Sequence, residues 1–243
     1  MMWDRKELKE RGKYAMASNR GACILVALIM GVVSLVFNNS SSGTAGSGTT
    51  EAMNGVNGIT NMDTEMALLF GAITTVALII SLIGLLLKIF IENTLKVGGY
   101  SFFIKNQSGM HPAFDCVLDG FRSGCYGNIT LTMFLRDLYV SLWSLLFVIP
   151  GIIKNYEYMM VPYILAENPG MDHKTAFKIS KRMMDGQKMD AFILDMSFLG
   201  WEILSACTFG ILGVLYVNPY EEATKAELYA FNKMKGFQEG YLR

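Results

Sequence analysis

Six ionisable side chains lie inside the long apolar runs of this sequence, and they are the residues that could carry chemistry. A charged group in hydrocarbon costs roughly 2.5–3.5 kcal/mol on insertion scales, so each needs a partner of opposite charge or a water-lined cavity. Such groups can hold helices together, or they can form a polar path for a proton, an ion or a small solute, and both readings stay open. The six residues are Arg136, Asp137, Lys154, Glu157, Asp195 and Glu202.

Spacing along the expected helices predicts how these charges pair. Asp195 and Glu202 are seven residues apart, which places them on one side of a helix. Arg136 and Asp195 lie within roughly one helical turn of each other in depth, counted from the inner ends of their helices. Lys154 and Glu202 both lie nearer the outer ends. We therefore predict that Arg136 pairs with Asp195 and that Lys154 pairs with Glu202.

Known catalytic and metal-binding patterns are missing from the sequence. There is no GxSxG, HExxH, P-loop or dinucleotide-binding glycine pattern. The four cysteines show no CxxC spacing, so we expect free thiols, and His111 with Cys116 and Cys125 fits no standard zinc spacing. Asp115 and Asp119 could form an acid–base pair, although a solvated helix face explains them better. We expect no enzyme, no metal and no cofactor.

The apolar runs indicate an integral membrane protein. Of the 243 residues, 52% are hydrophobic and 17% are charged, whereas about a quarter of a soluble domain is charged. A helix of about 20 apolar residues crosses the hydrocarbon layer. The net charge of zero gives no reason to expect nucleic acid. We predict an all-α polytopic bundle, one membrane domain over residues 1–243, with about six transmembrane helices at 21–37, 66–91, 128–149, 152–166, 189–206 and 209–229.

A turn at Pro150 and Gly151 sets the topology of the chain after it. Without that turn, the basic segment after residue 170 would lie outside, against the tendency of Lys and Arg to stay inside. The segment 38–65 has no Lys or Arg and is rich in Ser and Gly, so we expect a flexible outer loop. This gives a multi-pass protein of the cell membrane with both termini cytoplasmic. Spans 152–166 and 189–206 are short, so either could be re-entrant instead.

Two amphipathic segments are expected at the inner face. Residues 1–20 are either an interfacial helix, with Leu8, Gly12 and Ala15 on one side, or a solvated basic tail. Residues 172–186 predict a helix capped by Asp172. Its basic residues are Lys174, Lys178, Lys181 and Arg182. Binding of anionic phospholipid is expected there on charge alone, and an ordinary basic connector remains equally open.

Three stretches resemble a known family. They are LWSLLFVIPGIIKNYEYMMVPYILAENP from residue 142, AFKISKRMMDGQK from residue 176, and FILDMSFLGWEILSACTFGILGVLYVNPYEEATKAELYAF from residue 192. They are similar to bacterial integral membrane proteins classed as domain of unknown function 975, and more distantly to the membrane domain of some glycerophosphodiester phosphodiesterases. The resemblance extends over nearly the whole chain and is most specific over 142–231. It implies a multi-span helical fold and supplies no activity.

The expected role is therefore a non-catalytic membrane module that engages lipid or a partner protein, in envelope maintenance or export. A homo-oligomer is also possible on this reading. The alternative is a small-solute or ion transporter or channel that uses the intramembrane charges. A membrane-embedded enzyme is the third reading, disfavoured because no nucleophile and base stand in a usable pattern.

Overall fold

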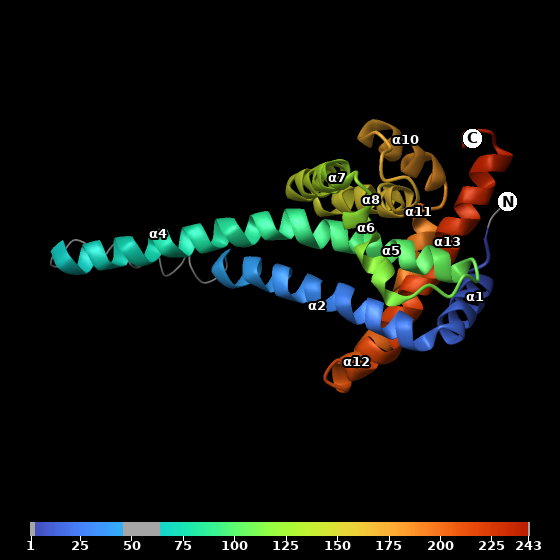
Figure 1. Cartoon of the computed structure of the whole chain (residues 1–243), viewed down its shortest axis with the longest axis horizontal. Helices are drawn as coiled ribbons and strands as arrows, with labels where there is room; N and C mark the ends of the chain where they lie inside the picture. Colours follow the sequence, from blue (N-terminus) through green and yellow to red (C-terminus); the bar gives the residue numbers. More distant parts are fainter. Residues whose placement is uncertain (1–2, 46–63, 243) are drawn as a thin grey trace. The chain divides into compact units, whose positions relative to one another are not determined.

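The computed structural model describes residues 3–45 and 64–242, and this part of the chain is helical throughout, with no strand. It forms two compact units, each described by itself (Figure 1). The larger unit holds residues 3–31 and 93–242. The smaller unit holds residues 32–45 and 64–92. The all-α fold expected from the sequence is confirmed.

The larger unit contains most of the helices. In chain order they are α1 (Arg5–Ser18), the first part of α2 (Arg20–Ala45), α5 (Asn93–Gln107), the 3₁₀ helix η3 (Phe114–Leu118), α6 (Asp119–Arg122), α7 (Tyr126–Leu146), α8 (Val148–Glu157), α9 (Val161–Glu167), α10 (His173–Met183), α11 (Lys188–Met196), α12 (Leu199–Cys207), the π-helical η4 (Gly213–Val217) and α13 (Asn218–Gln238). The smaller unit contains the rest of α2, α4 (Thr64–Leu87) and the π-helical η2 (Lys88–Glu92).

Two helices in the described part are long and apolar enough to cross a membrane. One is the continuous helix over residues 69–107, and the other is α7. A third would arise if residues 5–18 and 20–34, which meet at a bend of 104°, form one broken span. The large apolar side chains of α4 from Leu69 onward are mostly exposed, as expected of a helix in lipid. The chain is therefore suited to a membrane, and six transmembrane helices are not confirmed.

Each of the last three expected spans is divided between two shorter helices. Residues 152–166 form the end of α8 and most of α9, residues 189–206 form α11 and α12, and residues 209–229 form η4 and the first half of α13. A helix of nine residues extends only about 14 Å, less than half of the hydrocarbon layer. The prediction merged each pair of helices into one span, because the hydropathy of two apolar stretches does not show that the helix changes direction between them.

The expected outer loop at 38–65 is shorter than predicted. Helix α2 runs on to Ala45, because each further residue of a helix already formed adds a hydrogen bond at low cost, even in a Ser- and Gly-rich sequence. Helix α4 begins at Thr64. Residues 46–63 of the expected loop lie outside the described part of the chain.

The N-terminal segment is a packed helix rather than a basic tail. Asp4 caps α1 by accepting a hydrogen bond from the Lys6 N–H. Leu8, Gly12 and Ala15 are buried on one side of α1, as their spacing predicts. That side faces α13 and α5 inside the larger unit, not lipid. The core around it also takes side chains from α2, α9, α10 and α11.

Helix α10 agrees with the expected amphipathic helix. Asp172 is its N-cap and accepts a hydrogen bond from the Lys174 N–H, so the predicted cap is confirmed. Ala176, Met183 and Met184 are fully buried. They pack in the core of the larger unit, so the apolar side of α10 is already covered by protein.

The chain turns back between α7 and α8, which lie side by side (Figure 1). The break falls at Phe147, whose backbone is extended, rather than at Pro150 and Gly151. Pro150 is the third residue of α8, where its missing N–H costs nothing. Gly151 instead serves the packing: a Cβ placed there would lie 2.2 Å from Ser144 Oγ and 2.7 Å from Ser144 Cα.

Gly151→Ala should therefore destabilise the α7–α8 hairpin. The added methyl group meets the backbone of α7, and overpacking of this kind costs about 1–3 kcal/mol. We expect a lower melting temperature of the purified protein in detergent. Gly127→Ala in α7 is the matched control, since its Cβ would meet nothing within 4 Å. Equal melting temperatures for the two variants would show that the close approach of α7 and α8 is not constrained by Gly151.

Candidate functional site

A buried carboxylate, Glu157 at the end of α8, collects three lysines around it. Lys154 Nζ lies 2.9 Å from Oε1, and Lys188 Nζ lies 3.0 Å from Oε2. Lys181 Nζ is 3.7 Å from Oε1. The Glu157 side chain is only 4% exposed, whereas Lys181 is 64% exposed. One negative charge thus ties α8 to α10 and to the start of α11, and the site as a whole is positive.

A buried serine also joins the end of α8 to α10. Ser180 of α10, itself fully buried, donates its hydroxyl hydrogen to the Glu157 carbonyl oxygen at 2.8 Å. The hydroxyl oxygen of Ser180 in turn accepts from the Met160 N–H at 3.3 Å. Buried polar groups of this kind are stable only when they are hydrogen-bonded. The end of α8 is therefore fixed to α10 by backbone and side chain together.

Neither of the two predicted charge pairs forms. Arg136 donates to Asp137 at 3.1 Å and to the Asn155 amide oxygen at 3.3 Å, and Lys154 belongs to Glu157. The rotation of each helix about its own axis was not predicted. An i, i+3 neighbour such as Glu157 reaches Lys154 before any residue of another helix does. The predicted pairs of Arg136 with Asp195 and Lys154 with Glu202 are wrong.

Asp195 joins a second polar cluster that spacing did not reveal. The Tyr156 hydroxyl donates to Asp195 Oδ2 at 2.8 Å, and Lys225 Nζ lies 3.8 Å from Oδ1. Lys225 also forms an ion pair of 2.5 Å with Glu221. These α13 charges stood in plain view in the sequence EEATK, inside the span expected at 209–229. With Glu227, the expected span contains four charges, and they were the signal that this segment is not an ordinary transmembrane helix.

Two further oxygens border this cluster without a hydrogen-bond partner. Glu222 Oε2 and the Tyr163 hydroxyl are both buried and unpaired. The charges of Glu222, Glu221 and Asp195 all act on the Tyr163 hydroxyl, which places the four groups in one neighbourhood. Glu202 is exposed on α12 and forms no hydrogen bond or ion pair with the described residues, although the charges of Glu221 and Lys225 act on it. The six predicted charges thus separate into distinct sites.

The basic residues of α10 form an exposed face. Lys174, Lys178, Lys181 and Arg182 are all exposed, opposite the buried side of the same helix. The Arg182 guanidinium lies 5.8 Å from the centre of the Tyr241 ring. Burial, followed by the Glu239 carboxylate, raises the pKa of Tyr241, and Arg182 opposes that rise. The C-terminal residues thus cover one edge of the basic face.

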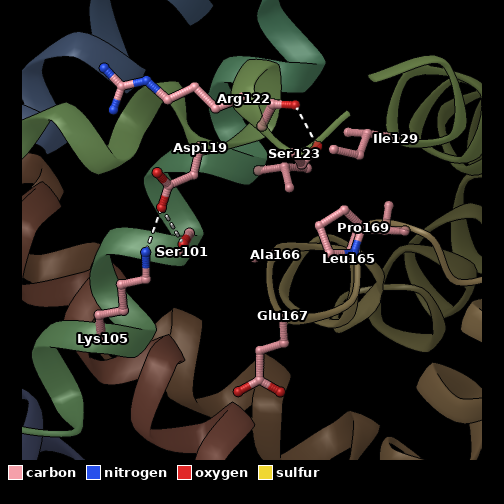
Figure 2. A pocket seen from close by; sticks show the side chains of 12 residues that line it. Ser101, Lys105, Asp119, Arg122, Ser123, Ile129, Leu165, Ala166, Glu167 and Pro169 are labelled. Atoms are coloured by element: carbon pink, nitrogen blue, oxygen red, sulfur yellow. Dashed lines mark hydrogen bonds and ion pairs between the residues drawn. The ribbon is translucent and has the colours of Figure 1, made fainter. Parts of the chain in front are cut away.

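A cavity of about 340 Å³ lies between α5, α6 and α9 (Figure 2). Lys105 reaches Asp119 at 2.5 Å, and Ser101 donates to the same carboxylate at 3.1 Å. Glu167 on the opposite wall accepts from Lys233 and Tyr229.

The charged side chains that line this cavity all have partners. Asp119 accepts from two partners on its own wall, and Arg122 extends away from the cavity toward Asp115, at 3.2 Å. At its edge, burial raises the pKa of the Cys116 thiol, and nearby Lys105 partly offsets this. No group of three His, Cys, Asp or Glu side chains in the described residues could hold a metal ion.

One family matches the chain. The family described as "Protein of unknown function (DUF975)" matches residues 144–233, from the last turn of α7 into α13. No curated protein and no solved structure matches the chain. The distant likeness to the membrane domain of glycerophosphodiester phosphodiesterases is therefore not shown. The predicted family resemblance is confirmed over this shorter stretch, where residues 144–233 are similar to the DUF975 family of proteins of unknown function.

Proposed function

We propose that this protein is a non-catalytic integral membrane module that binds anionic phospholipid at its cytoplasmic face, in the service of envelope maintenance or export. The observation that carries the proposal is that α10 is amphipathic, with a basic side and an apolar side. Its four basic side chains are exposed, and its apolar side is buried in the core. A basic face held in place by protein can meet lipid headgroups without inserting. Each such residue near an anionic surface contributes about 1 kcal/mol.

The charge balance around α10 supports the same role. Glu157 is the one carboxylate paired with Lys154, Lys181 and Lys188, so the positive charge of the site exceeds its negative charge. Lys174, Lys178 and Arg182 add to that excess with no carboxylate paired to them in the described part apart from the helix cap. In this proposal both termini and the segment 167–188 are cytoplasmic, since Lys and Arg favour that side.

Neutralising the α10 face should abolish the preference for anionic lipid. Lys174→Gln, Lys178→Gln and Arg182→Gln together remove three charges and leave Lys181 with Glu157. With about 1 kcal/mol per charge, the affinity for phosphatidylglycerol should fall on the order of 100-fold at low ionic strength. The measurement is the amount of phosphatidylglycerol retained per protein after purification from vesicles that mix it with phosphatidylcholine.

A matched triple variant on α1 serves as the control. The basic side chains of Arg5, Lys6 and Lys13 are also exposed. They lie among the acidic side chains of Asp4, Glu7 and Glu10, so α1 has no face of positive charge alone that their removal could abolish. Arg5→Gln, Lys6→Gln and Lys13→Gln should leave lipid retention nearly unchanged. Equal loss in the two triple variants would mean that total charge, and not the α10 face, governs lipid binding.

A polar path for a proton or a small solute is a second candidate function. It is favoured by the cluster of Asp195, Glu221 and Lys225, beside which Glu222 and Tyr163 have unpaired oxygens. Ionisable groups at such a place in a membrane protein often line a transport route. This candidate requires water to reach Asp195.

Thiol labelling separates the two candidates. In a protein without its native cysteines, Asp195→Cys should react with a water-soluble maleimide within minutes if a polar path exists. The lipid module predicts slow labelling there, because Tyr156 and Lys225 cover Asp195. Lys178→Cys, at an exposed position of α10, supplies the fully reactive reference. Labelling at 195 as fast as at 178 would favour transport over the lipid module.

A further inference from the structure

Two hairpins of the larger unit have apolar, exposed tips. The first joins α7 to α8 through Phe147, where residues 145–149 are all at least 63% exposed. The second joins α12 to η4, where Phe209 is 98% exposed and has a left-handed backbone with φ of 53°. A phenylalanine held in that conformation and in full contact with the surroundings is costly in water. Both tips need an apolar environment.

The number of consecutive uncharged residues in each hairpin limits how deeply the hairpin can insert into an apolar environment. Between Asp137 and Lys154 there are 16 uncharged residues, and between Glu202 and Glu221 there are 18. Each stretch is shared between two legs, so one leg is eight or nine residues, about 12–14 Å of helix. That is close to half of the roughly 30 Å hydrocarbon layer. The helix α4, in contrast, has 22 uncharged residues in a single leg, from Met66 to Leu87.

The charges at the bases of the hairpins agree with this half depth. Asp137 is 48% exposed, about 15 Å along α7 from the tip at Phe147. Glu202 is exposed and unpaired, about 10 Å along α12 from Phe209. If the tips reached the far side, both carboxylates would face acyl chains inside the membrane, at roughly 2.5–3.5 kcal/mol each. If the tips stop near the bilayer centre, both carboxylates come to the inner headgroups.

The length of α7 does not contradict this placement. Helix α7 passes the test for a membrane span by length and composition. Its first turns, however, are held inside the larger unit, where Ile129, Thr132 and Met133 are buried against other helices. Only the part beyond Asp137 is both free of charge and exposed along its length.

We propose that the α7–α8 and α12–η4 hairpins are re-entrant wedges that occupy only the acyl chains of the inner leaflet. Lipid hydrocarbon thus surrounds both apolar tips, and the chain after α5 never reaches the outer surface of the membrane. This rests on the proposed membrane location of the protein, and it adds which leaflet the protein engages. Lipid headgroups at the α10 face and acyl chains at the wedges then belong to one and the same leaflet.

Depth-dependent fluorescence quenching tests the proposal in the full-length protein. In a version without native cysteines, Phe147→Cys, Phe209→Cys and Ala77→Cys are each labelled with bimane and reconstituted in vesicles. The vesicles contain lipids brominated either near the headgroup or near the end of the acyl chain. Ala77 lies at the middle of the uncharged run of α4 and is the reference for the bilayer centre. Val148→Cys and Ile211→Cys replace the two tip variants if these misfold, since both positions are exposed.

The wedges predict that all three positions are quenched more by the deep bromines than by the shallow ones. They also predict that positions 147 and 209 stay unlabelled by an impermeant maleimide in intact cells. If positions 147 and 209 are quenched more by shallow bromines, the tips lie at the headgroups and the wedge proposal is overturned. If they are labelled from outside, the hairpins cross fully and the proposal is overturned as well. If position 77 also lacks deep quenching, the membrane location itself fails, which is a different outcome.

Discussion

The carboxylate of Glu157 is the constraint on which the arrangement of the larger unit depends. It is buried, so its charge must be matched, and the groups that match it come from α8, α10 and the start of α11. Because water does not solvate this buried carboxylate, its charge needs the lysines as partners. One group of contacts therefore sets three things: the direction of α8 after the turn at Phe147, the position of α10, and the position of the first residue of α11.

The side chains on the two sides of Glu157 differ in character. On the side of α1, α9 and α13, the larger unit has a mixed core of methionines, tyrosines and paired charges, such as Glu167 with Lys233. On the other side, α8 carries only uncharged side chains from Val148 to Ile153, and most of these are exposed. The Glu157 cluster thus stands at the boundary between a protein core and an apolar hairpin. In the proposed membrane placement, this boundary lies at the headgroups, where lysines can meet phosphates.

The sequence was a good guide to which segments are helical and a poor guide to how they connect in space. The all-α fold, the cap at Asp172 and the shared side of Leu8, Gly12 and Ala15 follow from local rules of composition and spacing. The pairing of Arg136 and Lys154 did not, because it depends on helix rotation and on tertiary contacts between distant elements. Hydropathy also merged α11 with α12, since both are apolar and the turn between them has no Gly or Pro. The charges of α13 were a visible warning that the last expected span was not a simple one.

A double-mutant cycle on Glu157 and Lys188 tests this account most directly. The free energies of unfolding of the wild type, Glu157→Gln, Lys188→Gln and the double variant would be measured by denaturant titration in detergent. Removing one member of a buried pair costs up to about 3–5 kcal/mol, so we predict a large loss for Glu157→Gln and a coupling of at least about 1 kcal/mol. The exposed pair Glu7 and Arg11, 2.8 Å apart, is the control and should couple by less. Additive losses at Glu157 and Lys188, no larger than those of the control pair, would contradict the central role of Glu157.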